Sequence, residues 1–109
     1  MAEVIWSPRS LKDINEIAEY IAKDSIQYAE EQVKVFFEKA RMLEKFPSSG
    51  RMMPELQIAS IRQILCGNYK IIFEIINSER VAIITVHHQS RLLKNNPALK
   101  KLLRRKRNK

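Results

Sequence analysis

The residues best suited to chemistry lie in one stretch, Val86-His87-His88-Gln89-Ser90-Arg91. It holds both histidines of the chain, and Arg91 follows His88 by three residues. An imidazole titrates near pH ~6.5, whereas an arginine is a permanent cation that binds phosphate or carboxylate groups. The stretch closes an alternating apolar run over residues 81–86, which predicts a β-strand. A titratable ring beside a fixed cation at a strand end indicates phosphate chemistry or recognition of an acidic group.

A second arginine joins this pair if the predicted strands have a suitable register. Arg62 alternates with Ile61 and Gln63, so its side chain points to one face of its strand. In the last strand, alternation puts Ala82, Ile84, Val86 and His88 on one face, and Ile83, Thr85 and His87 on the other. We therefore hypothesise that Arg62, His88 and Arg91 flank one pocket.

These residues also have structural interpretations, and the sequence alone leaves both kinds open. His88 can end its strand by hydrogen-bonding a backbone group. Arg62 can pair with Glu74 across the sheet, which is worth under ~1 kcal/mol. Arg51 can bind the last carbonyl groups of the preceding helix.

The elements that position these groups follow from periodicity. Residues 4–6 predict a strand, and Ser7-Pro8 predicts the start of a helix over residues 8–23. That helix has an apolar stripe, with Lys12, Asp13 and Glu16 on its polar face. A second amphipathic helix must end near Phe46, because Pro47 disfavours helical geometry before it. The two helices form an antiparallel hairpin.

The rest of the chain predicts three strands and a short terminal helix. Strands over residues 61–65, 69–76 and 81–86 are joined by short turns, which is typical of an antiparallel meander. We expect an α+β fold, a small antiparallel β-sheet (strand, helical hairpin, then three-stranded meander) with the helices packed on one face. The opposite face is expected to be open and concave. Residues 1–96 are predicted to form the domain, and residues 97–109 a basic C-terminal helix or tail.

The net charge of +8 is unevenly distributed. Residues 100–109 carry seven basic side chains and no acid, whereas residues 1–99 hold 13 basic and 12 acidic ones, a net charge of +1. Such a tail binds nucleic acid without reading its sequence, or it serves as a solvated end.

Composition excludes several classes of function. Cys66 is the single cysteine, so no disulfide forms within the chain, and a reducing cytoplasmic location is expected. Two glycines are too few for a glycine-rich phosphate loop. No spaced cysteine or histidine cluster predicts a metal site, so we expect no metal and no cofactor. No apolar stretch is long enough to span a membrane.

The ordered set of motifs resembles the RelE/ParE toxin superfamily over residues 3–93. It comprises the helical hairpin, Phe46-Pro47-x-x-Gly50-Arg51, Ile61-Arg62, Tyr69-x-Ile71-x-Phe73 and Val86-x-His88-Gln89-Ser90. The resemblance implies the toxin of a bacterial type II toxin–antitoxin system, which inhibits growth, stabilises plasmids and is neutralised by a cognate antitoxin.

The superfamily has two kinds of target, and this decides whether the chain is an enzyme. RelE-like members cleave mRNA in the ribosome. That reaction needs an acid or base and cations, for which His88, Arg62 and Arg91 are the candidate catalytic residues. Glu55 and Tyr69 are weaker candidates.

ParE-like members inhibit DNA gyrase without a hydrolytic set, and Arg51, Arg62, His88 and Arg91 are then candidate target-binding residues. Two features favour the ParE-like branch. The body of the chain is nearly neutral, and no tyrosine follows Tyr69. His88-Gln89-Ser90 also resembles the ParE form of this strand end.

Overall fold

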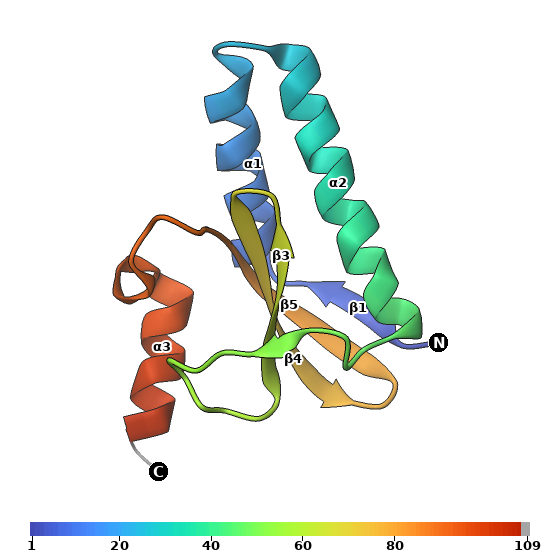
Figure 1. Ribbon diagram of the computed structural model, residues 1–109, viewed down its shortest axis with the longest axis vertical. Coiled ribbons are helices and arrows are strands. Elements are labelled where there is room, and N and C mark those ends of the chain that lie inside the picture. Colours follow the sequence, from blue (N-terminus) through green and yellow to red (C-terminus); the bar gives the residue numbers. More distant parts are fainter. Residues whose placement is uncertain (108–109) are drawn as a thin grey trace.

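The computed structural model describes residues 1–107 as one sheet with helices on both sides (Figure 1). The elements are, in order, β1 (Glu3–Trp6), α1 (Pro8–Ala22), α2 (Ile26–Lys45), β2 (Arg51–Met52), β3 (Ile61–Cys66), β4 (Tyr69–Asn77), β5 (Arg80–His88), the 3-10 turn η1 (Leu93–Asn95) and α3 (Pro97–Arg107). The last two residues of the predicted basic tail lie outside the described residues. No helix within residues 1–107 is long and apolar enough to cross a membrane.

The sheet has the strand order β1-β5-β4-β3-β2, which confirms the α+β class and the meander. Strands β2 to β5 pair antiparallel, but β1 lies parallel to β5, with Val4 opposite Val81. The sheet is therefore mostly antiparallel, as predicted, with one parallel pairing at its β1 edge. The helical hairpin carries the chain away from β1, so this strand pairs with a segment distant in sequence.

The helical hairpin packs on one face of the sheet, as predicted (Figure 1). Ser7 Oγ accepts a hydrogen bond from Ser10 N at 3.0 Å, and Ser25 Oγ accepts one from Tyr28 N at 3.1 Å. Each serine thus satisfies an orphan amide at the start of its helix. Phe36 and Leu43 of α2 are fully buried in the same apolar cluster as Phe73 of β4.

The opposite face of the sheet is covered, which corrects the expectation of an open face. A second apolar cluster joins the loop after β2, the sheet and α3, and Met53, Ile61, Ile72 and Leu99 are 0% exposed within it. Figure 1 shows α3 across the sheet from the helical hairpin. The buried leucines of α3 pack against isoleucines of the sheet. Burying such a side chain contributes about 1.5–3 kcal/mol to the stability of the fold.

A β-bulge interrupts the alternation in β5. Phe73 pairs with Ile83 and Ile72 pairs with Thr85, so Ile84 is the extra residue. As a result Ile83 and Val86 both belong to the apolar cluster beneath the helical hairpin, whereas Ile84 packs against the apolar cluster beneath α3. The predicted faces of β5 were therefore wrong on one side of Ile84, because an inserted residue reverses the alternation of side chains along the strand.

Candidate functional site

A cleft of about 440 Å³ lies between α1, the end of β5 and the segment that leads into α3. Its wall contains His88 and Arg91, two of the residues predicted from sequence, together with Tyr69. The charged residues around it come mostly from α1 (Arg9, Asp13, Glu16 and Glu19), and Lys23 lies at the C-cap of this helix. The cleft is the place where the predicted strand-end residues face a neighbouring element.

His88 is held by its own turn. Its Nδ1 accepts a hydrogen bond from Ser90 N at 3.1 Å, and Ser90 Oγ lies 2.7 Å from the same nitrogen. A backbone amide can only donate, so Nδ1 carries the lone pair and the neutral ring carries its proton on Nε2. The ring also meets Tyr69 edge-on, with centroids 5.1 Å apart. The neutral His88 ring therefore offers its surroundings a donor rather than a base.

His87 is buried at 5% exposure and holds the same turn from the other side. Its Nδ1 lies 3.1 Å from Asn96 Nδ2, and its Nε2 lies 2.9 Å from the carbonyl oxygen of Arg91. Because the amide nitrogen of Asn96 donates, the neutral ring donates through Nε2 to Arg91. The sequence indicated no role for His87, but in the structure its side chain supports the turn that carries Arg91.

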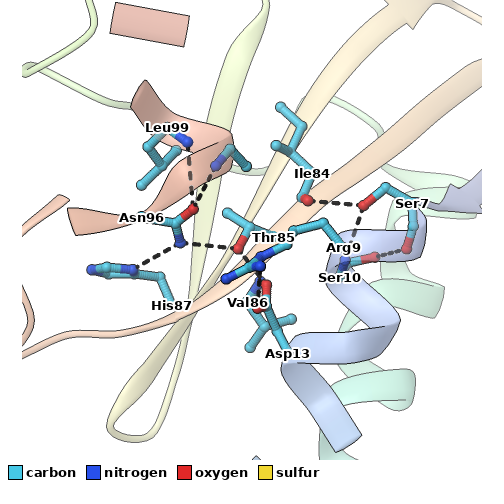
Figure 2. Close-up of polar contacts among 11 residues, drawn as sticks. Ser7, Arg9, Ser10, Asp13, Ile84, Thr85, Val86, His87, Asn96 and Leu99 are labelled. Atoms are coloured by element: carbon cyan, nitrogen blue, oxygen red, sulfur yellow. Dashed lines mark hydrogen bonds and ion pairs between the residues drawn. The ribbon is translucent and has the colours of Figure 1, made fainter. Parts of the chain in front are cut away.

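A buried polar network continues from His87 to α1 (Figure 2). Asn96 Nδ2 also donates to Thr85 Oγ1 at 3.1 Å, and Thr85 Oγ1 donates to Asp13 Oδ2. The same carboxylate oxygen accepts from Val86 N at 3.1 Å, and Asp13 Oδ1 lies 3.2 Å from Arg9 Nε. The network ties α1, β5 and the start of α3 together.

Asp13 corrects a further expectation from the sequence. We assigned it to the solvent face of its helix, but it is 7% exposed. A buried carboxylate is costly unless it is paired, and here its partners come from its own helix and from β5. The Arg9–Asp13 spacing of four residues was the only local signal of this arrangement.

The side chain of Arg91 is exposed at the edge of the cleft, while its backbone N donates to His88 O at 3.1 Å. The pKa of the nearby Tyr69 hydroxyl is raised, mainly by burial and further by Tyr28 and Tyr20, while the positive charge of Arg91 acts to lower it. The guanidinium is therefore close enough to the cleft to act on groups inside it.

The other two predicted arginines lie at the far edge of the sheet. Arg62 donates from Nε to Ala59 O at 2.9 Å and from Nη1 to Gly50 O at 3.4 Å, so it holds the loops on both sides of β2. Arg51 is exposed in β2, opposite Gln63. Neither arginine lines the cleft. The hypothesis of one pocket flanked by Arg62, His88 and Arg91 was therefore wrong in its geometry.

The register explains this separation. Arg62 pairs with Phe73 near one end of β3, whereas His88 pairs with Tyr69, which pairs with Cys66 at the other end. Four residues of strand span about 13 Å, and two further strand spacings add about 10 Å across the sheet. The candidate site residues thus form two groups, His88 with Arg91 and Arg51 with Arg62.

The cleft is balanced in charge. Its lining includes three acids (Asp13, Glu16 and Glu19) and three basic residues (Arg9, Lys23 and Arg91). Within residues 1–107, no group of three or more histidine, cysteine or acidic side chains is arranged to hold a metal ion. Such a lining suits recognition of a mixed polar surface better than the capture of a polyanion.

Comparison with known proteins bears on this site. A family model described as the ParE toxin of the type II toxin–antitoxin system, parDE, matches residues 4–93. A solved structure from the chromosomal ParDE TA system from P. aeruginosa is similar in fold, with a TM-score of 0.67 and 15% sequence identity, and the match covers 81% of this chain and 96% of that chain. No curated protein sequence matches the chain.

Proposed function

We propose that this chain, which belongs to the ParE toxin family of type II toxin–antitoxin systems, inhibits DNA gyrase by binding it through the cleft at the end of β5. The chain is a toxin, and its system supplies an antitoxin as its partner. The observation that carries the proposal is the family match over residues 4–93, which includes His88 and Arg91. We further propose that it acts in the cytoplasm, where gyrase works.

The geometry of the cleft supports binding of a protein target. A hydrolytic mechanism needs an acid or base and charge-stabilising cations within reach of one reacting phosphate. Arg62 lies outside the cleft that His88 and Arg91 line, and its guanidinium is engaged with two backbone carbonyls. The Nε2–H of His88 and the guanidinium of Arg91 are donors that suit carbonyl or carboxylate groups on a protein surface.

A RelE-like mRNA endoribonuclease is the second candidate. The observation that favours it is the placement of His88 and Arg91 on one turn, since an imidazole beside a cation is a minimal acid and phosphate-binding pair. In that case the imidazolium form of His88 would donate a proton to the 5′-oxygen as its bond to phosphorus breaks and return to the neutral ring, while solvent water takes the proton of the attacking 2′-hydroxyl. Arg51 and Arg62 would have to contact RNA at the other edge of the sheet.

A supercoiling assay tests the first proposal. Purified protein is incubated with gyrase, relaxed plasmid and ATP, and supercoiled product and trapped cleavage complexes are measured. We expect inhibition by the wild type and at least a tenfold weaker effect from His88→Ala or Arg91→Ala. Arg41→Ala, an exposed cation on α2, is the matched control and should inhibit like the wild type.

Primer extension on RNA from induced cells tests the second candidate in parallel. The second proposal would replace the first if the wild type had no effect on gyrase but caused cuts within translated codons. These cuts should disappear in His88→Ala. Gyrase inhibition without such cuts would support the first.

A further inference from the structure

We propose that the outer face of α3 is a binding surface for duplex DNA, which the chain contacts through phosphate groups. The surface is defined by Lys100, Lys101 and Arg104, all exposed on the side of α3 away from the sheet. Helix α3 lies beyond the family match, which ends at residue 93. The proposal is therefore separate from the gyrase proposal and does not depend on it.

The cations of this surface are fixed in place rather than carried on a loose tail. Asn96 Oδ1 accepts hydrogen bonds from Ala98 N at 3.0 Å and Leu99 N at 3.4 Å, which caps the helix. Leu99 is 0% exposed and Leu102 is 7% exposed against the sheet. A helix anchored in this way holds the backbone of its outer residues in a constant arrangement.

The positive charge of this surface is uncompensated. Lys100 and Arg104 are four residues apart and Lys101 and Arg104 are three apart, so the side chains are neighbours about 5–6 Å apart at Cβ. Among the side chains that the structure describes, none of the three forms an ion pair. Glu79 is the last acidic residue of the chain, so the stretch that forms α3 contains no acid of its own. Like charges at these spacings repel, and a polyanion would relieve the repulsion.

The chemistry of α3 favours duplex DNA over the other partners that a basic helix can bind. A membrane would need the leucines, but Leu99 and Leu102 are buried in the protein. Protein interfaces have cores that are poor in lysine, whereas this surface consists of lysine and arginine alone. Recognition of single-stranded nucleic acid relies on stacking aromatic side chains, and no Phe, Trp or Tyr follows Phe73. A duplex offers a dense row of phosphates, with one charge per ~1.7 Å of its axis.

The test measures how salt weakens binding to a fluorescently labelled 24-base-pair duplex, in the absence of gyrase. Anisotropy titrations between 50 and 200 mM salt compare the wild type with the triple variant Lys100→Gln, Lys101→Gln, Arg104→Gln. Three phosphate contacts contribute a slope of about 2.7 in log K against log salt, so the wild type should lose about 40-fold more affinity than the variant over this range.

A matched control removes three exposed cations elsewhere, Lys12→Gln, Arg41→Gln and Lys45→Gln, and should keep the wild-type slope. A second variant, Lys100→Arg with Lys101→Arg, keeps the charge and should also keep the slope. The proposal is overturned if the wild type does not bind the duplex at 50 mM salt, if both triple variants lose the same slope, or if a 24-nucleotide single strand or polyglutamate of equal charge competes as well as the duplex.

Discussion

Replacement of Asn96 by alanine is the sharpest test of the buried network. The Asn96 side chain caps α3 through Oδ1 and donates through Nδ2 to Thr85 and His87. Loss of an N-cap costs about 1 kcal/mol. The change also leaves His87 Nδ1 without its buried donor and removes the hydrogen bond from Asn96 to Thr85. Leaving a buried polar group unsatisfied costs about 1–3 kcal/mol of stability. We therefore expect Asn96→Ala to lower the free energy of unfolding by about 3 kcal/mol.

Two matched variants separate the cap from the network. Asn96→Ser keeps a capping oxygen but is too short to reach Thr85 and His87, so it should cost about 2 kcal/mol. Ser25→Ala removes an exposed cap on α2 with no network behind it and should cost about 1 kcal/mol. Asn96→Ala should thus exceed Ser25→Ala by the contribution of the network.

Urea denaturation followed by circular dichroism and by Trp6 fluorescence measures these differences. With an m-value of about 2 kcal/mol/M, 3 kcal/mol lowers the midpoint by about 1.5 M. Nitrogen NMR of the histidines gives an independent readout, because the His87 Nδ1 resonance should shift only in the Asn96 variants, in which this nitrogen loses its donor. Equal destabilisation by Asn96→Ala and Ser25→Ala, with an unchanged His87 ring, would refute the reasoning.

Three further predictions follow from burial, close packing and ionisation. Leu99→Ala should lower the free energy of unfolding by about 2–5 kcal/mol in urea denaturation, because the Leu99 side chain is fully buried. Leu92→Ala, at an exposed position, should lower it by under ~0.5 kcal/mol. Similar losses in the two variants would contradict the packing of α3. Gly50→Ala places its Cβ 2.6 Å from a ring carbon of Phe73, so we expect about 1–3 kcal/mol of destabilisation, and a neutral result would show that the ring yields. The raised pKa of Tyr69 means that its neutral form is favoured on folding, so stability is fully present below pH 10 and falls as the pH rises above it. Absorbance at 295 nm should therefore show a late ionisation phase from Tyr69, and Tyr69→Phe should remove that phase and reduce the alkaline loss of stability.

The local elements were predictable because their signals are local. Ser7 caps α1 as the sequence indicated, Ser25 caps α2 in the same way, and the apolar stripes of both helices pack on the sheet. The parallel pairing of β1 with β5 was not predictable from periodicity, because it joins residues 77 positions apart in sequence. The bulge at Ile84 was missed for a related reason, since alternation assumes that every residue takes its place in the ladder.

The site was predictable in part. The histidine and arginine at the end of β5 do line a cleft, because adjacent residues in a turn stay together whatever the register. The hypothesis that Arg62 joins them was wrong, because it depended on the register of two strand pairs. Asp13 was missed because a carboxylate in an amphipathic pattern normally faces solvent, and only contacts across the fold justify its burial.

Asn96 joins the two surfaces that we propose, and this gives a way to tell their roles apart. Its Oδ1 fixes the start of α3, whose cations we propose to bind DNA, while its Nδ2 holds His87, which in turn holds the carbonyl of Arg91 in the turn that we propose to bind gyrase. His88→Ala should therefore weaken only gyrase inhibition, and the triple substitution on α3 should weaken only DNA binding. Asn96→Ala should weaken both, because both surfaces depend on one side chain. If Asn96→Ala spared either activity in protein that is still folded, that surface would not depend on the network.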